Sequence, residues 1–488
     1  MNLETYFAQF RKHIIGLDAV MTTPAGETIP LVYADWVASG RMYAPLEDFM
    51  REQVAPLVAN THTETTYSGT VMTRTYHQAR EIIKRHVGAG PEDSLFLTGF
   101  GMTAAINKLQ RIMGLRLPEG CPSDCHDSGR PLVIVTHMEH HSNQITWEEC
   151  ACDVEILPRE EVTGLPDLHY LERILEKNRR RPLLIGAFSA CSNVTGLMPP
   201  YHKMAGMMHR AGGLCFVDFA ASAPYADINM HPSQADEYLD GIYFSPHKFL
   251  GGPGSSGVLV MRNELYKRSI PDQPGGGTVK WTTPFGSHSY LDEIELREDG
   301  GTPGFLQAIR TAGAVLIKEA MGTDKIRARE EEELEILLEE LRKEPRIFLL
   351  EGRNLDRLGI VSIYAPGVHH NLIVKLLNDL YGIQTRGGCS CAGTYGHILF
   401  SINQETSGHI TQMIEQGDLT EKPGWVRISL HPTMTDQEVR FIGRAVREVI
   451  ARCDTLKEDY LFDPHTGEFS RKGGEADLPA LMEGFSPL

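Results

Sequence analysis

The segment SPHKFLGGPGSSG (245–257) decides the fold and the chemistry that the sequence predicts. In this segment Lys248 follows Ser245 and His247 at the end of an apolar run, and a glycine-rich turn comes next. A lysine in this position is partly shielded from water, which lowers its pKa and prepares the amine to form a Schiff base. Ser245 and His247 offer hydrogen-bond donors to a phosphate, and the glycines let the backbone approach closely. The alternative is a surface lysine beside an ordinary turn.

Six short apolar runs around this segment predict buried strands. They lie at residues 94–98, 131–136, 182–190, 213–220, 241–245 and 256–261. Helical patterns separate these runs, and apolar strands that alternate with helices are typical of a parallel sheet covered on both faces. We therefore expect an α/β fold with a large domain over residues 33–300.

The second half of the chain follows a different pattern. Residues 305–345 predict a long helical stretch, and its charge run RAREEEELEILLEELRKE (327–344) is typical of the solvated face of an amphipathic helix. Later strand and helix patterns predict a smaller α/β domain over residues 301–460. We expect residues 1–32 to form an N-terminal segment packed on this domain, and residues 461–488 to form a surface tail.

Composition and charge exclude several classes of protein. The chain has 488 residues and a net charge of −17, which disfavours nonspecific binding to nucleic acid or to an anionic membrane. It holds no apolar run long enough to span a bilayer, and its start, MNLETYFAQFRKH, lacks the features of a signal peptide, so we expect a cytoplasmic protein. Nine cysteines are too few for a secreted disulfide scaffold, which raises the question of a working thiol.

Two further residues follow predicted strands. Asp218, in CFVDFAASAPY (215–225), could place a carboxylate against the pyridinium nitrogen of pyridoxal 5′-phosphate, although an Asp that caps a helix is common at such a turn. His140, in MEHHSNQITWEE (138–149), could stack on a planar cofactor or move protons. The adjacent histidines also allow a metal site, but no HExxH-like pattern supports it, and we expect no metal.

The segment TGFGMTAAIN (98–107) follows a strand and opens a helix, so its backbone amides predict an anion site suited to a phosphate. The same segment contains Gly99-x-Gly101-x-x-Ala104, a weak match to a dinucleotide-binding motif. NAD binding is therefore a minor alternative.

The segment TRGGCSCAGTYGH (385–397) is a glycine-rich loop with two cysteines and Arg386. A nearby arginine favours the thiolate form, while the alternatives are two inert thiols or a metal site. The pattern Cys121-x₃-Cys125-His126 is a rival metal site in a segment, 115–130, that resembles an inserted loop. Arg427 is a single arginine in an apolar strand, and a substrate carboxylate is a natural partner for it.

Taken in order, these residues resemble those of the class V aminotransferase superfamily of fold-type I pyridoxal phosphate enzymes. Within it, the chain is most similar to the cysteine desulfurase and selenocysteine lyase branch. The segments YADWVASG (33–40) and YHQAREIIKRHVGA (76–89) add to the resemblance. The resemblance implies a large domain with a mainly parallel, seven-stranded type of sheet and a smaller C-terminal α/β domain that carries the Cys loop.

The resemblance also implies roles for residues at the cofactor. Lys248 would form the Schiff base and move the proton, Asp218 would bind the pyridinium nitrogen, and His140 would stack on the ring. The phosphate cup would consist of Gly101, Met102, Thr103, Ser245 and His247. Thr278 would reach the phosphate of a neighbouring subunit, which implies a homodimer.

Other implied roles concern the substrate. Asn193 would contact both cofactor and substrate, Arg386 and Arg427 would bind the substrate, and Cys391 would be the nucleophile. The implied reaction removes sulfur from L-cysteine to give alanine and a Cys391 persulfide, which a sulfur-acceptor protein would then discharge. One alternative is a C–S lyase or aminotransferase that does not use Cys391. Another is a non-catalytic sulfur-carrier or interaction protein on the same fold.

The chain departs from the family pattern at several positions. Ala221 stands where the family has a glutamine beside the cofactor, and Met102 stands in place of a threonine in the phosphate loop. Trp36 falls near the expected substrate entrance, and Cys389 adds a second thiol, as in the desulfurase domain of molybdenum cofactor sulfurases. The segment 392–424 is longer than in a compact desulfurase.

Overall fold

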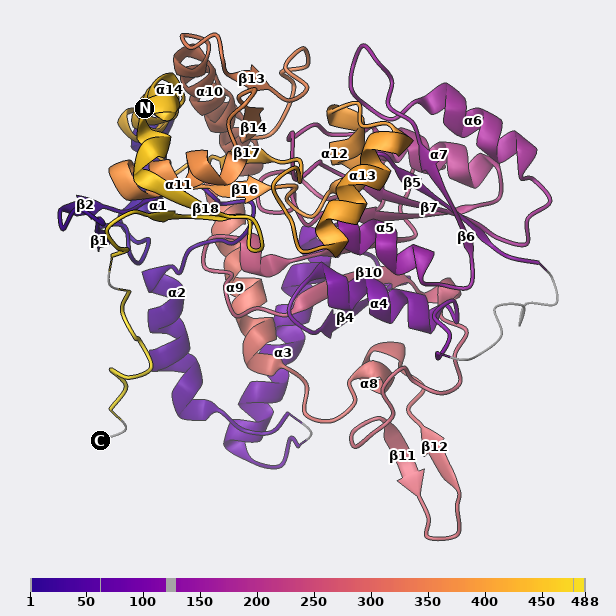
Figure 1. Cartoon of the computed structure of the whole chain (residues 1–488). Helices are drawn as coiled ribbons and strands as arrows, with labels where there is room; N and C mark the ends of the chain where they lie inside the picture. The colour runs from indigo at the N-terminus through magenta and orange to yellow at the C-terminus, as the bar shows by residue number, and fades with distance from the viewer. Residues whose placement is uncertain (1, 62, 120–128, 477, 487–488) are drawn as a thin grey trace.

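The computed structural model describes residues 2–61, 63–119, 129–476 and 478–486. Its centre is a seven-stranded sheet with helices on both faces (Figure 1). The strands are β4 (Asp93–Thr98), β5 (Leu132–Thr136), β6 (Asp153–Leu157), β7 (Leu184–Ser189), β8 (Leu214–Asp218), β9 (Gly241–Phe244) and β10 (Gly257–Arg262). Their spatial order is β4-β10-β9-β8-β7-β5-β6, and β10 alone runs antiparallel to both of its neighbours. The prediction of a mainly parallel α/β sheet is confirmed.

The central strands are apolar on both faces because both faces are covered. Successive residues of a strand point to opposite sides, so Ile134 belongs to one hydrophobic core and its neighbours Val133 and Val135 to the other. Helices α3 (Tyr67–His86), α6 (Leu168–Lys177), α7 (Tyr201–Arg210) and α9 (Phe305–Met321) cover the first face. Helices α4 (Met102–Ile112) and α5 (His141–Glu148) cover the second. The edge strand β6 alternates polar and apolar residues, which is why no apolar run predicted it.

A second, smaller sheet lies in the C-terminal part of the chain. It has the order β13 (Phe348–Leu349), β14 (Ile360–Tyr364), β17 (Trp425–Ser429) and β16 (Arg386–Gly388), with every pair antiparallel. Its main helices are α10 (Thr323–Leu341), α11 (His370–Tyr381) and α14 (Asp436–Leu456), and α14 begins at a capping box formed by Thr435 and Glu438. The exact limits of the two domains stay a prediction.

The N-terminal helix α1 (Leu3–Arg11) packs on this smaller unit. Phe7 and Phe10 enter its hydrophobic core, and Arg11 lies 2.8 Å from Glu438 of α14. The pairing of β3 (Val32–Tyr33) with β15 (Ile383–Gln384) then leads the chain towards the large sheet.

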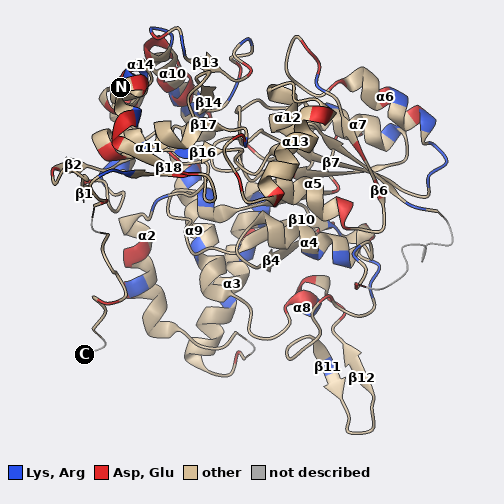
Figure 2. Cartoon of the chain, in the orientation of Figure 1, with Lys and Arg blue, Asp and Glu red and all other residues tan. Residues whose placement is uncertain are grey.

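The predicted helical stretch over 305–345 is two helices, because Gly322 adopts a positive φ of 79° and breaks it between α9 and α10. Figure 2 shows charged residues along α10 and α14 on the outside of the smaller unit. The charge run does form an amphipathic helix with exposed glutamates on one face, but Glu330 and Glu333 of the run are buried. Burial raises the pKa of Glu330 to about 8.

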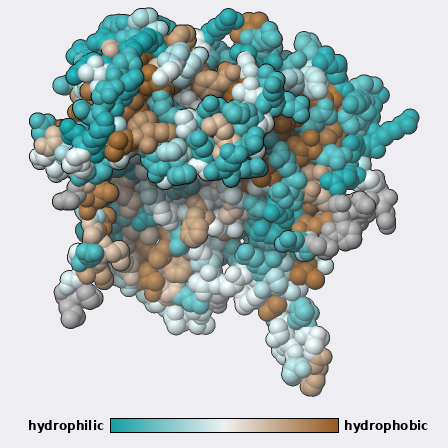
Figure 3. All heavy atoms as spheres, viewed as in Figure 1, coloured by the Kyte–Doolittle hydropathy of each residue, from teal (hydrophilic) through white to brown (hydrophobic). Residues whose placement is uncertain are grey.

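Two hairpins extend from the body of the molecule. The hairpin of β11 (Val279–Thr282) and β12 (His288–Tyr290) projects away from the large sheet (Figure 3). Phe285, between the two strands, is 93% exposed. The predicted tail instead contains β18 (Tyr460–Asp463) and β19 (Glu468–Arg471), which pack on α11. There the Asn371 side chain donates to the Gly467 carbonyl over 2.8 Å.

The remaining strands and α-helices lie outside the two main sheets. They are β1 (Val20–Thr22), β2 (Thr28–Pro30), α2 (Ala44–Phe49), α8 (Ile294–Glu298), α12 (Gly393–Leu399) and α13 (Gln404–Glu415), the last two within the lengthened segment 392–424. Among the helices of the described residues, none combines the length and the apolar character needed to cross a bilayer.

Candidate active site

A cavity of about 740 Å³ lies where the carboxyl ends of the parallel strands meet the smaller unit. Ligands bind at this end of open parallel sheets because several loops converge there. The cavity is lined by every predicted site residue except Thr278, namely Gly101, Met102, Thr103, His140, Asn193, Asp218, Ser245, His247, Lys248, Arg386, Cys391 and Arg427. The tertiary structure therefore brings together residues that are spread over more than 300 positions of the sequence.

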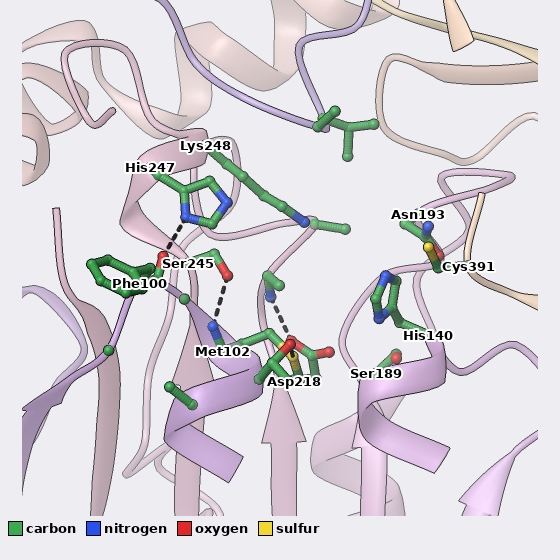
Figure 4. A pocket seen from close by; sticks show the side chains of 18 of the residues that line it. Phe100, Met102, His140, Ser189, Asn193, Asp218, Ser245, His247, Lys248 and Cys391 are labelled. Carbon is green, nitrogen blue, oxygen red and sulfur yellow. Dashed lines mark hydrogen bonds between the residues drawn. The ribbon is translucent and has the colours of Figure 1, made fainter. Parts of the chain in front are cut away.

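Lys248 ends a short turn after β9 and extends across the cavity (Figure 4). Close packing fixes this turn, since the Gly40 amide donates to the His247 carbonyl over 2.9 Å and a Cβ on Gly40 would lie 1.9 Å from the Phe249 carbonyl oxygen. Burial lowers the pKa of Lys248 to about 8, although the Asp218 carboxylate opposes the shift. A substantial fraction of this amine is therefore neutral and nucleophilic near neutral pH.

Asp218 is the last residue of β8 and is 4% exposed. One of its carboxylate oxygens accepts a hydrogen bond from the Ala220 amide over 2.8 Å. Burial raises the pKa of Asp218 to about 7, with the Ala220 hydrogen bond and Lys248 acting in the opposite direction. A buried carboxyl group of this kind gains from a cationic partner, such as a protonated ring nitrogen.

The loop before α4 forms an anion cradle. The Met102 amide donates to the Ser245 hydroxyl oxygen over 2.9 Å, and His247 Nδ1 lies 2.8 Å from the Phe100 carbonyl oxygen (Figure 4). A Cβ on Gly101 would lie 2.9 Å from the His247 ring and 3.0 Å from the Ser245 hydroxyl, so only glycine fits there. The cradle joins a helix N-terminus, backbone amides and two polar side chains, which is the donor set that a phosphate prefers.

His140 caps helix α5, and its Nδ1 accepts a hydrogen bond from the Ser142 amide over 3.1 Å. Burial, together with the nearby charge of Lys248, lowers the pKa of His140 to about 3. The imidazole is therefore neutral at physiological pH, which suits stacking on a ring better than carrying a proton. The neighbouring His141 accepts from the Gly393 amide over 2.8 Å, so both histidines of the metal alternative already have hydrogen-bond partners.

Glu139 is a buried residue next to His140 that the sequence analysis did not single out. Its carboxylate accepts hydrogen bonds from the Thr136 hydroxyl at 2.6 Å, the Asn143 amide at 2.7 Å and the Ser189 amide at 3.0 Å. It thus joins β5, α5 and β7 and holds the turn that carries His140. The only signal in the sequence was an acidic residue three positions after the apolar run 131–136.

Cys391 lies on the Cys loop (residues 385–392), which comes from the smaller unit. The Asn193 side chain donates to the Ser390 carbonyl over 2.8 Å, and the His141 amide donates to the Cys391 carbonyl over 2.7 Å. These bonds join the Cys loop to the large sheet. In Figure 4 the Cys391 sulfur lies near Asn193 and His140, on the far side of the cavity from the backbone of Lys248.

The cysteines of the described residues fall into two groups. Five of them, Cys150, Cys152, Cys191, Cys215 and Cys453, are buried, and burial raises the pKa of each thiol. Cys389 and Cys391 are partly exposed. Since the thiolate is the reactive form, these two are the best nucleophiles among the described cysteines. Cys121, Cys125 and His126, the rival metal site, lie outside the described residues.

The two terminal nitrogens of Arg427, in β17, each have a hydrogen-bond partner. One terminal nitrogen lies 2.6 Å from a carboxylate oxygen of Asp35, and the other donates to the Asn193 carbonyl over 3.2 Å. Its Nε and the Asn193 side-chain oxygen are buried and have no hydrogen-bond partner among the described residues. Arg427 lines the cavity from a buried position, while Arg386 lines it from an exposed one.

Three positions differ from or add to the sequence analysis. Trp36 does not stand at the entrance; it is buried, and its ring stacks on His431 with centroids 4.0 Å apart. Its neighbour Asp35 serves the site instead, through Arg427. Thr278 lies buried at the foot of the β11–β12 hairpin and donates to the Gly275 carbonyl over 2.7 Å, so its proposed reach to a neighbouring subunit stays a prediction.

Two proteins of known name are similar to this chain in sequence. The chain is 29% identical over 376 residues to a probable cysteine desulfurase of Halalkalibacterium halodurans, covering 74% of this chain and 84% of that protein. It is 25% identical over 371 residues to a cysteine desulfurase of Haloferax volcanii, covering 75% and 82% of the two chains.

Solved structures show the same fold. A cysteine desulfurase of Thermococcus onnurineus matches with a TM-score of 0.72 at 23% identity, over 91% of this chain and 98% of that one. A cysteine desulfurase of Escherichia coli matches with a TM-score of 0.69 at 22% identity, over the same shares of the two chains. The family model for class-V aminotransferases matches residues 32–442, and the chain belongs to this family.

Proposed function

We propose that this protein is a pyridoxal 5′-phosphate-dependent cysteine desulfurase that takes sulfur from L-cysteine, releases alanine and holds the sulfur as a persulfide on Cys391. The observation that carries the proposal is the meeting of Lys248, Asp218, His140 and Cys391 in one cavity. The similarity to proteins named cysteine desulfurases supports the choice of substrate.

The residues of the cavity fit this cofactor. The cradle of Gly101, Met102, Ser245 and His247 would hold its phosphate, and the buried Asp218 would meet its ring nitrogen. The neutral His140 ring would lie flat against the cofactor, and the Lys248 amine would hold it covalently. When bound, pyridoxal phosphate supplies an electron sink that stabilises a carbanion at the substrate α-carbon.

Each residue then has a defined task. Arg427 orients the substrate carboxylate through its free Nε, with Asp35 fixing the other end of the guanidinium. Lys248 removes the α-proton and later returns a proton to the product. The Cys391 thiolate attacks the substrate sulfur, so that an S–S bond forms as the carbon–sulfur bond breaks, and the carbon part leaves as alanine.

The proposal includes a homodimer in the cytoplasm that delivers its sulfur to an acceptor protein. The β11–β12 hairpin, with Trp281 and Phe285 exposed, offers an apolar surface to a second copy. The seven described cysteines are all unpaired, which suits a reducing compartment.

A substrate panel tests the proposal. Protein loaded with pyridoxal phosphate is incubated with L-cysteine, L-selenocysteine or L-alanine in the presence of a thiol reductant, and sulfide, alanine and keto acid are assayed. We expect alanine and sulfide from L-cysteine, a loss of more than about 100-fold in Cys391→Ser, and little change in the matched control Cys453→Ser. Keto acid without sulfide, or full turnover in Cys391→Ser, would point to an aminotransferase or lyase that does not use Cys391.

A further inference from the structure

The Cys loop separates two cavities. The first is the active-site cavity, and the second, here called the outer cavity, has a volume of about 290 Å³. Arg386, Ser390 and Cys391 line both cavities, whereas Cys389 is among the residues that line the outer one. The loop thus lies between the two cavities: Cys391 borders both of them, and Cys389 borders the outer one.

A tight turn limits the backbone separation of Cys389 and Cys391. The Ala392 amide donates to the Cys389 carbonyl over 2.9 Å, and both central residues, Ser390 and Cys391, have positive φ values of 50° and 58°. Positive φ at both central positions is the pattern of a type I′ turn, and it is costly for residues other than glycine, asparagine and aspartate. Two trans peptide units hold the Cα atoms of Cys389 and Cys391 within about 7.6 Å of each other. A sulfur bound to the Cys391 thiol extends about 2 Å beyond it, and both cysteines line the outer cavity, where such a sulfur could pass between them.

Neighbouring contacts hold the turn in this shape. The Trp425 indole donates to the Ser390 hydroxyl over 3.2 Å, and the Asn193 side chain donates to the Ser390 carbonyl. Ser390, between the two cysteines, is therefore fixed on both its side chain and its backbone. Such anchoring explains how a costly backbone conformation is maintained.

The outer cavity has the chemistry of a sulfur site. Arg386 and Lys422 line it, and neither forms an ion pair within the described part of the chain, while Glu468 is the one acidic side chain among the lining residues. The two cations offer favourable electrostatic interactions to a negatively charged persulfide in this cavity. His370 also lines this cavity, and burial lowers its pKa to about 3, so its imidazole is neutral.

Close packing places His370 beside the Cys loop. A Cβ on Gly424 would lie 2.6 Å from the His370 ring, and a Cβ on Gly387 would lie 3.3 Å from it. The β18–β19 hairpin closes the opposite side of the cavity through Thr466, Gly467 and Glu468. Residues of the segment 392–424 and of the C-terminal β18–β19 hairpin therefore complete the outer cavity.

We propose that Cys389 is a second sulfur carrier, which takes the sulfur from Cys391 and presents it in the outer cavity. This inference rests on the desulfurase function proposed above. In the transfer, the Cys389 thiolate attacks the outer sulfur of the Cys391 persulfide; a new S–S bond forms at Cys389 while the S–S bond at Cys391 breaks, and Cys391 leaves as a thiolate. No net oxidation or reduction occurs, and Cys391 becomes free to react with a second substrate molecule.

A burst experiment tests the relay. Protein loaded with pyridoxal phosphate is mixed with excess L-cysteine without reductant or acceptor, and the alanine released in the first rapid phase is counted per active site. Because two cysteines can each store one sulfur, we expect about two alanine molecules per site in the unaltered chain and about one in Cys389→Ser. The matched control Cys453→Ser, with a thiol buried in α14, is expected to release about two.

The position of the sulfur gives an independent readout. After alkylation, fragmentation mass spectrometry should find sulfane sulfur on both Cys389 and Cys391 of the unaltered chain, and on Cys391 in Cys389→Ser. A single alanine per site with sulfur confined to Cys391, or an equal burst in Cys389→Ser and the unaltered chain, would overturn the relay while leaving the desulfurase function intact. A full burst in Cys391→Ser would instead overturn the role of Cys391 as the first sulfur acceptor, and a lack of alanine from the unaltered chain would overturn the desulfurase function itself.

Discussion

The guanidinium of Arg427 lies 2.6 Å from the carboxylate of Asp35, although 392 residues separate the two in the sequence. This ion pair fixes one end of the arginine and leaves its Nε buried at the cavity without a partner among the described residues. Asp35 therefore acts as a positioning residue for the group that is proposed to bind the substrate carboxylate.

Removal of Asp35 tests this relationship. In Asp35→Ala the buried guanidinium loses its carboxylate, and we expect the free energy of unfolding to fall by about 3 kcal/mol. Adding Arg427→Met should recover part of that loss, because it removes the unpaired charge. Denaturant unfolding of the single and double variants measures both effects. The exposed pair of Arg51 and Asp48 is the control, and Asp48→Ala should unfold like the unaltered chain. Equal stability of Asp35→Ala would contradict a structural role for the pair.

The anion cradle predicts a specific effect of Gly101→Ala. The added methyl group would meet the His247 ring and the Ser245 hydroxyl at about 3 Å, so both donors must move. We expect the dissociation constant for pyridoxal phosphate to rise about tenfold, the effect of losing about 1.4 kcal/mol of binding free energy. Titration of the cofactor-free protein, followed by fluorescence, measures it. Gly408→Ala, in α13 with open space around it, is the matched control and should bind normally.

The pKa of Lys248 predicts how cofactor attachment depends on pH. Only the neutral amine can attack an aldehyde, so below the pKa of about 8 the rate should fall about tenfold per pH unit, and above it the rate should level off. Stopped-flow absorbance on cofactor-free protein gives the profile. Since the Asp218 carboxylate holds this pKa up, Asp218→Asn should move the profile to lower pH.

Lys318 offers a control for that profile. Burial lowers its pKa to about 7, yet it lies at the far end of α9 and donates to the Ala226 carbonyl instead of lining the cavity. Lys318→Met should therefore keep the pH dependence of cofactor attachment. A profile that changed in Lys318→Met and not in Asp218→Asn would show that the titrating group is Lys318 and not Lys248.

Burial predicts the order in which thiols react. Alkylation of the native protein with iodoacetamide should modify Cys389 and Cys391 well before Cys150, Cys191 or Cys215, because buried thiols with raised pKa values are poor nucleophiles. Peptide mass spectrometry at successive times measures the order. Labelling in denaturant should remove the differences, and early modification of Cys191 in the native protein would contradict the burial found here.

Local sequence patterns predicted most of the fold. The six apolar runs are strands of the large sheet, because strands buried on both faces need continuous apolar residues. Strand β6 was missed since Asp153 and Glu155 interrupt its apolar pattern at the sheet edge. The break at Gly322 was missed because helical periodicity continues on both sides of it.

The sequence by itself determined that Lys248, Asp218 and His140 belong to one site, because each lies at or within a few residues of the carboxyl end of a strand, and parallel strands bring these ends together. Only the tertiary structure decided that Asp35, and not its neighbour Trp36, serves the cavity, since the packing of Trp36 on His431 turns the two side chains to different sides. It also decided that Cys389 borders a second cavity while Cys391 borders both. The physical reason is the same in both cases: the direction of a side chain in an irregular segment depends on contacts with distant parts of the chain, which no local pattern encodes.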